Sequence, residues 1–211
     1  MKVFLAIPTI NKIFPDVVNK IFKITKDTKH ETQLFFISQQ PTDVSRNKCV
    51  EAFLKTDCDV LWFLDDDQIP LEDIYELLDK DFDIIAPLTY IYQEHNLIPN
   101  LFMIDDNKKR IKKDTDIGLE KVDACGMGCV FIKRDVFEKI QKPYFKFLTN
   151  DEHNLVTESE TFYFFNKCKQ QDINVFVDTS RNCGHIKNFN LDLVGYQMAK
   201  AVSNCRGRKN D

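Results

Sequence analysis

The sequence predicts an α/β fold in which helices cover both faces of a mostly parallel central sheet and a small part is antiparallel. Over the first half of the chain, short apolar runs alternate with segments that have the periodicity of amphipathic helices. Each run is apolar throughout, as expected for parallel strands that are buried on both faces. Residues 88–120 contain weaker strands and a polar turn, so we expect a hairpin or an irregular insertion there.

Strands and helices alternate closely in the first half. The predicted strands are Val3–Ile7, Leu34–Ile37, Val60–Leu64 and Asp83–Pro87. The predicted helices lie between them, at Pro15–Lys26, Asp43–Lys55 and Leu71–Leu78. Proline is favoured in a first helical turn, as at Pro15, and Asp43 or Ser45 is a suitable N-cap for the second helix.

The second half of the chain is less regular. Its predicted strands are Leu101–Ile104, Lys121–Ala124, Cys129–Ile132 and Asn174–Asp178. Its predicted helices are Asp135–Ile140, 157–171 and Leu191–Asn204. A length of 211 residues without internal repeats suits a single domain over 1–211, and the charged end is equally compatible with a fragment of a longer chain.

Charge, hydropathy and cysteine usage restrict the partners and the compartment. With 29 basic and 33 acidic residues, the net charge of −4 argues against nucleic acid as a main partner. No apolar run approaches the roughly 20 residues of a membrane span. The seven cysteines are scattered and form no C-x-x-C pair, which favours free thiols in a reducing compartment. We therefore expect a cytoplasmic protein, of a bacterium or, for a viral chain, of its host.

Three consecutive acids, Asp65, Asp66 and Asp67, directly follow the predicted strand Val60–Leu64. In open α/β sheets, ligands bind beyond the carboxyl ends of the strands. One aspartate would be enough to cap the helix at Leu71, so three acids favour metal or phosphate binding. Oxygen ligands of this kind suit Mg²⁺ or Mn²⁺, especially where a substrate phosphate completes the coordination shell.

Five stretches in this order resemble the GT-A glycosyltransferases, chiefly those like family 2. They are Ala6-Ile7-Pro8-Thr9, Ser45-Arg46-Asn47, Phe63-Leu64-Asp65-Asp66-Asp67, Cys125–Ile132 with Arg134–Phe137, and Asn174–Asp178 with Cys183-Gly184-His185-Ile186. The resemblance covers nearly the whole chain, and the third stretch is the D-x-D match. It implies the GT-A fold, a Rossmann-like nucleotide-diphospho-sugar transferase fold. The chain is also similar to a glycosyltransferase domain of a chlorella virus protein.

The resemblance implies a metal site and a role for each acid. Asp67 would coordinate Mn²⁺ or Mg²⁺ directly, and His185 would be the second protein ligand. Asp65 would contact the nucleotide ribose, or the metal through water, and Asp66 would support the nucleotide. The other histidines, His30, His95 and His153, are expected at the surface.

Five further residues are expected around the donor. Pro8 and Thr9 end the first strand, where a nucleobase and ribose would lie, although a simple strand-ending turn explains them equally well. Arg46 could pair with the diphosphate, and a cation in a first helical turn calls for a nearby anion in any case. Gly126 and Gly128 would allow close backbone approach or positive φ beside the sugar, or a tight turn.

The catalytic base is where the sequence departs from the family pattern. Inverting relatives carry Glu-Asp at the start of the helix after the acceptor loop, and the alignment places Glu160 on the Glu and Thr161 on the Asp. Threonine cannot remove the acceptor proton, so Glu160 or Glu158 is the candidate base. Both are also explained by favourable negative charge in a first helical turn. Without the Asp, retaining and inverting stereochemistry both stay open.

The function that the resemblance implies is metal-dependent transfer of a sugar from a nucleotide-diphosphate sugar, with UDP-sugars favoured, to a glycan or glycoprotein acceptor. Two alternatives remain. One is a nucleotidyltransferase of similar architecture. Such enzymes usually hold a triphosphate with a glycine-rich loop after the first strand, and the absence of glycine from the loop Pro8–Lys12 argues against this alternative. The other is a binding module for sugar nucleotides or glycans that has lost its chemistry, which the absence of the Asp at position 161 favours.

Overall fold

The structure is a computed structural model, and it describes most of the chain up to residue 187. The described residues are 1–10, 12–26, 29–93, 96–105, 110–112, 116–150, 152 and 155–187. The predicted helix Leu191–Asn204 lies outside these residues, as do His95 and His153.

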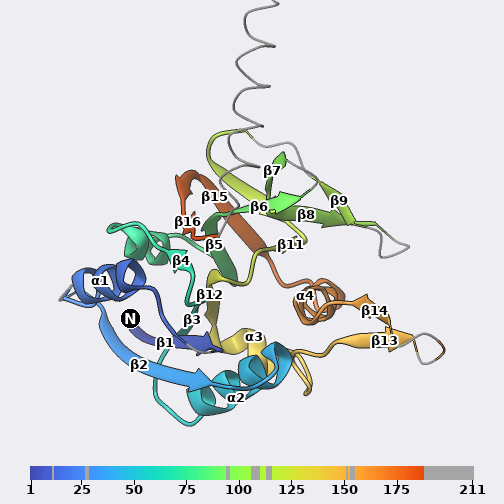
Figure 1. The fold of residues 1–211 in the computed structure, drawn as a ribbon, viewed down its shortest axis with the longest axis horizontal. Coiled ribbons are helices and arrows are strands. Elements are labelled where there is room, and N and C mark those ends of the chain that lie inside the picture. Colours follow the sequence, from blue (N-terminus) through green and yellow to red (C-terminus); the bar gives the residue numbers. More distant parts are fainter. Residues whose placement is uncertain are drawn as a thin grey trace, which may run out of the picture.

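A seven-stranded mixed sheet runs through the molecule in the order β10-β15-β5-β12-β3-β1-β2 (Figure 1). Its strands are β1 (Lys2–Thr9), β2 (Glu31–Ser38), β3 (Val60–Leu64), β5 (Ile84–Leu88), β10 (Leu119–Val122), β12 (Cys129–Lys133) and β15 (Val175–Asn182). β1 is parallel to both β2 and β3, and β5 is parallel to β15. β12 lies antiparallel between β3 and β5 and joins the two parallel groups. The predicted α/β fold with a mostly parallel sheet is confirmed.

Helices cover both faces of this sheet. They are α1 (Pro15–Ile24), α2 (Thr42–Leu54), α3 (Arg134–Lys139), α4 (Glu160–Gln170) and the 3₁₀ helix η1 (Ile74–Asp79). The predicted caps of α2 are wrong: the helix begins after Pro41, so Asp43 and Ser45 lie inside its first turn. The predicted helix over 157–171 is too long, because its start belongs to a hairpin of β13 (Leu148–Asn150) and β14 (Leu155–Glu158).

Two apolar layers, one on each face of the sheet, form the core. Phe4 and Ala6 of β1 face α2, α3 and α4, while Val3, Leu5 and Ile7 face α1 and η1. All five are at most 1% exposed, which explains why the strand is apolar without alternation. Aromatic pairs fill each layer. The Trp62 and Phe131 rings stack 5.1 Å apart, and those of Phe145 and Phe164 stack 4.8 Å apart.

Small antiparallel sheets lie beyond the carboxyl ends of the central strands. They consist of β6 (Tyr90–Gln93) with β7 (Asn96–Pro99), β8 (Leu101–Ile104) with β9 (Arg110–Lys112) and β11 (Ala124–Cys125), and β4 (Gln68–Ile69) with β16 (Gly184–His185). The expected hairpin region is therefore present. Pairing of β16 with β4 brings the end of the described chain to the residues after β3.

Asp178 in β15 is a buried carboxylate, 2% exposed, that several polar groups contact. One carboxylate oxygen accepts hydrogen bonds from the backbone N–H (3.1 Å) and hydroxyl (2.5 Å) of Ser180. The other lies 3.5 Å from Lys80 Nζ and 3.5 Å from Arg181 Nε. Burial opposes ionisation, but the bonds from Ser180 and the charge of Lys80 outweigh it and hold the pKa of Asp178 below its ordinary value of 3.8.

We expect Asp178→Asn to lower the free energy of unfolding by about 1–3 kcal/mol at neutral pH. Because the folded-state pKa is depressed, the stabilisation is complete above pH 3.8 and disappears as the pH falls through the folded value. Urea unfolding at a series of pH values checks this. The wild-type should lose more stability than the variant between about pH 5 and pH 3, and parallel curves would contradict the assignment.

Candidate active site

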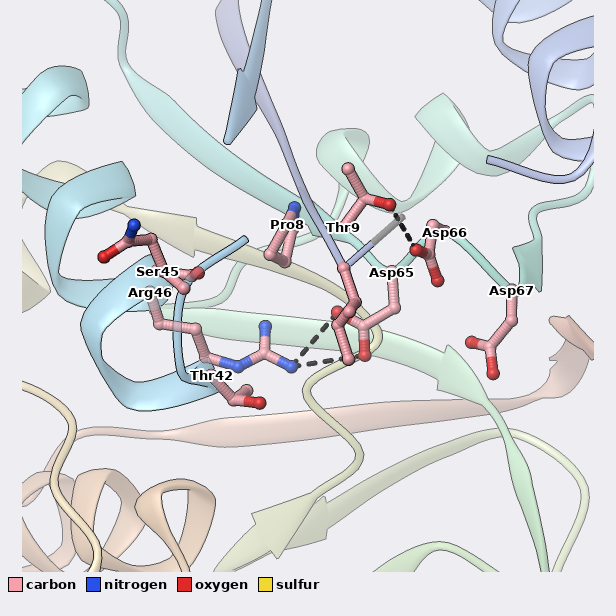
Figure 2. A pocket seen from close by; sticks show the side chains of 10 residues that line it. Pro8, Thr9, Thr42, Ser45, Arg46, Asp65, Asp66 and Asp67 are labelled. Carbon is pink, nitrogen blue, oxygen red and sulfur yellow. Dashed lines mark hydrogen bonds and ion pairs between the residues drawn. The ribbon is translucent and has the colours of Figure 1, made fainter. Parts of the chain in front are cut away.

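A cavity of about 160 Å³ lies where β1 and β3 end (Figure 2). It is lined by Pro8, Thr9, Ile10, Gln40, Thr42, Ser45, Arg46, Asp65, Asp66 and Asp67. β1 and β3 are adjacent parallel strands, so their carboxyl ends meet at one edge of the sheet. The structure therefore brings the predicted nucleotide loop, Pro8 and Thr9, to the three acids.

The three aspartates point in different directions, and Figure 2 shows Asp65 directed at Arg46 and Asp66 at Thr9. Asp65 accepts two hydrogen bonds from Arg46 Nη2, at 3.1 and 3.2 Å. Asp66 accepts one from the Thr9 hydroxyl at 2.5 Å. Asp67 is the acceptor for Lys187 Nζ at 2.7 Å. Each aspartate therefore has its own hydrogen-bond donor beside the cavity.

Arg46 is the most buried charged group of the site, with 3% of its surface exposed. Besides Asp65, its Nε lies 3.6 Å from Glu160 Oε1, and its Nη1 lies 3.5 Å from the Met127 carbonyl oxygen. The guanidinium carbon is 5.1 Å from the centre of the Phe63 ring. The anions expected near this residue are thus two protein carboxylates. Arg46 therefore links Glu160 to Asp65, and Arg46 and Asp65 both line the cavity.

The two candidate bases differ in their surroundings. Glu160 begins α4 directly after the N-cap Ser159, is 7% exposed, and accepts a hydrogen bond from the Thr161 hydroxyl at 3.1 Å. Glu158 ends β14 and is held by Asn166, whose Nδ2 donates to it at 3.0 Å. Through Arg46, Glu160 is linked to Asp65 at the cavity. The hydrogen-bond partner of Glu158 is Asn166 of α4, which is not one of the site residues.

The loop before β12 approaches the site closely at Gly128. The Gly128 carbonyl accepts a hydrogen bond from the Asp65 N–H at 2.8 Å. A Cβ added at Gly128 would meet Asp65 Oδ2 at 2.9 Å, and one at Gly126 would meet Asn100 Nδ2 at 2.5 Å. Both glycines therefore allow close packing, as expected, but their neighbours here are protein side chains. A role beside the sugar stays a prediction.

His185 reaches the site because β16 pairs with β4. Its Nε2 lies 3.2 Å from Asp67 Oδ2, and its Nδ1 lies 3.0 Å from the Tyr90 carbonyl oxygen. A carbonyl oxygen and a carboxylate only accept, so in this arrangement both ring nitrogens carry a proton: Nδ1–H donates to Tyr90 and Nε2–H donates to Asp67. Loss of the Nε2 proton would free that lone pair for a cation. The hydrogen bond with Asp67 raises the pKa of His185. Burial raises the pKa of Asp67, but the bonds from His185 and Lys187 outweigh it and keep that pKa low.

Comparison with solved structures identifies the architecture. The chain is similar to A197 from STIV, with a TM-score of 0.63 and 20% identity over 89% of this chain and 87% of that one. It is also similar to UDP-glucose pyrophosphorylase complexed with UDP-glucose, with a TM-score of 0.51 and 9% identity over 100% of both chains. The fold is that of nucleotidyltransferases and GT-A-like transferases. At these identities the likeness shows the fold alone.

The remaining comparisons identify no family for this chain. No protein-family model matches it, and no curated protein is similar to it. The likeness to a chlorella virus protein finds no support. In the part of the chain that the structure describes, no helix is long and apolar enough to cross a membrane.

The residues present fit a divalent cation at Asp67 and His185. A carboxylate oxygen and an imidazole nitrogen suit Mn²⁺, and Mg²⁺ would bind mainly through the carboxylate. Among the described residues, no group of three or more His, Cys, Asp or Glu side chains gathers to hold a metal. Water and substrate phosphate would have to supply the other ligands, which is usual for these cations.

Sequence reasoning missed Lys187. Its ammonium group shares Asp67 Oδ2 with His185, so it is the nearest positive charge to the candidate cation site. Its position two residues after His185 in an extended segment was the available signal, because such residues point to the same side of the chain. The surface position expected for His30 is wrong: this residue is 5% exposed and packs edge-on against Tyr75.

Proposed function

We propose that this chain is a metal-dependent glycosyltransferase that moves a sugar from a nucleotide-diphosphate sugar, with a UDP-sugar favoured, to a hydroxyl group of a glycan or glycoprotein. The observation that carries the proposal is the Asp67–His185 pair at the carboxyl edge of a parallel sheet, beside the cavity at Pro8 and Thr9. One structural neighbour, UDP-glucose pyrophosphorylase, is complexed with UDP-glucose, which supports a nucleotide-sugar ligand for this chain.

The residues of the chain have separate tasks in this proposal. Pro8, Thr9 and Asp66 hold the nucleoside, and Asp65, fixed by Arg46, accepts a ribose hydroxyl or a metal-bound water. Asp67 and His185 hold Mn²⁺ or Mg²⁺, which neutralises negative charge on the leaving diphosphate. Lys187 adds a second positive charge at the same place. Gly126 and Gly128 keep the backbone close beside the sugar.

Glu160 is the proposed general base. It removes the proton of the acceptor hydroxyl as the oxygen attacks the anomeric carbon and the bond to the diphosphate breaks. Its contact with Arg46, at 3.6 Å, fixes its position next to Asp65. Glu158 stays a second candidate, since a carboxylate that accepts a hydrogen bond from the neutral amide of Asn166 is chemically capable of the same step.

Calorimetric titration with UDP, with and without Mn²⁺, tests the proposal. Wild-type protein should bind UDP with micromolar affinity only in the presence of Mn²⁺. Asp67→Asn should weaken this binding by about 100-fold, because a neutral amide is a poor ligand for a hard cation. Asp57→Asn is the matched control: Asp57 is exposed and pairs with Lys2, so binding should not change.

Two outcomes would overturn the proposal. UDP binding that is equally strong without Mn²⁺ and in Asp67→Asn would remove the metal site. Absence of UDP binding under both conditions would remove the UDP-sugar donor.

The similarity in fold to UDP-glucose pyrophosphorylase favours nucleotidyl transfer as a second candidate function. The two reactions release different nucleotides. A glycosyltransferase turns a UDP-sugar into UDP, whereas a nucleotidyltransferase supplied with pyrophosphate turns it into UTP. Chromatography of the nucleotides after incubation with UDP-sugar, Mn²⁺ and pyrophosphate separates them, and a pure binding module releases neither.

A further inference from the structure

A second cavity, of about 380 Å³, lies beside the Asp67–His185 pair. Its lining residues come from the hairpin β6–β7 and from the segment 182–187, which contains β16. They are Tyr90, Tyr92, Leu97, Asn182, Cys183, Gly184, His185 and Lys187. The volume lies within the range of about 300–1,000 Å³ that is usual for small-molecule sites.

The register of the hairpin builds one wall of this cavity. Tyr92 lies opposite Leu97, and Ile91 lies opposite Ile98. Because side chains alternate along a strand, Tyr90, Tyr92 and Leu97 share one face, and Ile91 points the other way and packs against the core. The three are 36%, 39% and 70% exposed. We call this face, formed by Tyr90, Tyr92 and Leu97, the tyrosine plate, and it is an exposed surface that is mainly aromatic.

The polar lining residues connect this cavity to the candidate active site. His185 and Lys187 both contact Asp67 Oδ2, and Asn182 adds an amide from the end of β15. Any molecule in this cavity therefore lies next to the group that would hold the cation and the leaving diphosphate.

We infer that this cavity binds a pyranose ring of the acceptor, with the tyrosine plate as its platform. A pyranose has an apolar C–H face that suits an aromatic wall, and hydroxyl groups around its edge that suit amide and ammonium partners. The tyrosine plate supplies the aromatic wall, and Asn182 and Lys187 supply the amide and ammonium partners. The inference rests on the proposed glycosyltransferase activity and gives it an acceptor class, a saccharide.

Direct binding tests the inference without nucleotide or metal. The probes are methyl glycosides of glucose, galactose, mannose and N-acetylglucosamine, and the readout is saturation-transfer NMR with each protein. At least one glycoside should bind to wild-type protein at millimolar concentration. Tyr92→Ala should weaken it by about tenfold, and Tyr92→Phe, which keeps the ring, by no more than about twofold. Phe22→Ala, at an exposed site on α1, should have no effect.

The outcomes separate this inference from the proposed function. If Mn²⁺-dependent UDP binding is present and no glycoside binds, or Tyr92→Ala binds as well as wild-type, the saccharide cavity is overturned and the donor site stands. If a glycoside binds through Tyr92 and UDP does not bind, the cavity stands and the transferase proposal falls. A Tyr92→Ala variant that loses uridine instead of glycosides would make the plate a nucleobase site and overturn the inference.

Discussion

Arg46→Met should lower the free energy of unfolding by about 3 kcal/mol, a large effect for one side chain at this site. Methionine fills the space but leaves Asp65 and Glu160 without their shared cation. The Glu160 side chain is 10% exposed and cannot recover the loss from water, whereas that of Asp65, at 31%, recovers part of it. Urea unfolding at neutral pH measures the change.

Two further variants identify the cause. Arg46→Lys keeps the charge but loses the planar fork that reaches both carboxylates, so an intermediate loss is expected. Adding Glu160→Gln to Arg46→Met removes one stranded charge, and the double variant should be more stable than the sum of the single changes implies, by about 1–3 kcal/mol. If Arg46→Met is as stable as wild-type protein, the guanidinium does not hold the two carboxylates together.

The second large effect is expected for Gly128→Ala, which should weaken Mn²⁺-dependent UDP binding by at least about tenfold. The added Cβ would meet Asp65 Oδ2 at 2.9 Å and Gln68 Cγ at 3.0 Å. One of these side chains has to move. A displaced Asp65 loses its bonds to Arg46 and its position at the cavity.

Gly126→Ala is the matched control for this change. Its Cβ would meet Asn100 Nδ2 and Thr89 Oγ1, at 2.5 and 2.7 Å. Neither of these residues is one of the acidic residues at the cavity. Both variants should lose about 1–3 kcal/mol of stability through overpacking. Only Gly128→Ala should lose UDP affinity at a temperature where both are folded. Equal affinities in the two variants would contradict a role for Asp65 in binding.

The central strands could be predicted from the sequence because burial on both faces leaves a direct signal. Val60–Leu64 was predicted with its observed bounds, and the acids after it lie at the predicted edge of the sheet. The antiparallel direction of β12 could not be predicted, since apolar runs of parallel and antiparallel strands look alike when both faces are covered.

The site was harder to predict because its decisive contacts join distant parts of the chain. The pairing of Arg46 with Glu160 depends on how α4 docks, which no local pattern encodes. The contacts of Asp67 with His185 and Lys187 likewise depend on β16 meeting β4. The caps of α2 were misjudged for a local reason: Pro41 already fixes the backbone before the helix, and no side-chain cap is used.

The position of β12 between β3 and β5 determines which part of the sheet stays incomplete while the chain is being synthesised. β1, β2 and β3 can pair as soon as residue 64 is free, but the apolar edge of β3 stays open until residues 129–133 arrive. The synthesis of Glu160, the second partner of Arg46, follows that of Arg46 by roughly 5–20 s at ordinary rates of translation. During that interval the nascent chain exposes the unpaired edge of β3, and Arg46 has only one of its two carboxylate partners. Chains that stop before residue 129 should therefore aggregate, and holdase chaperones should bind this protein while it is being made.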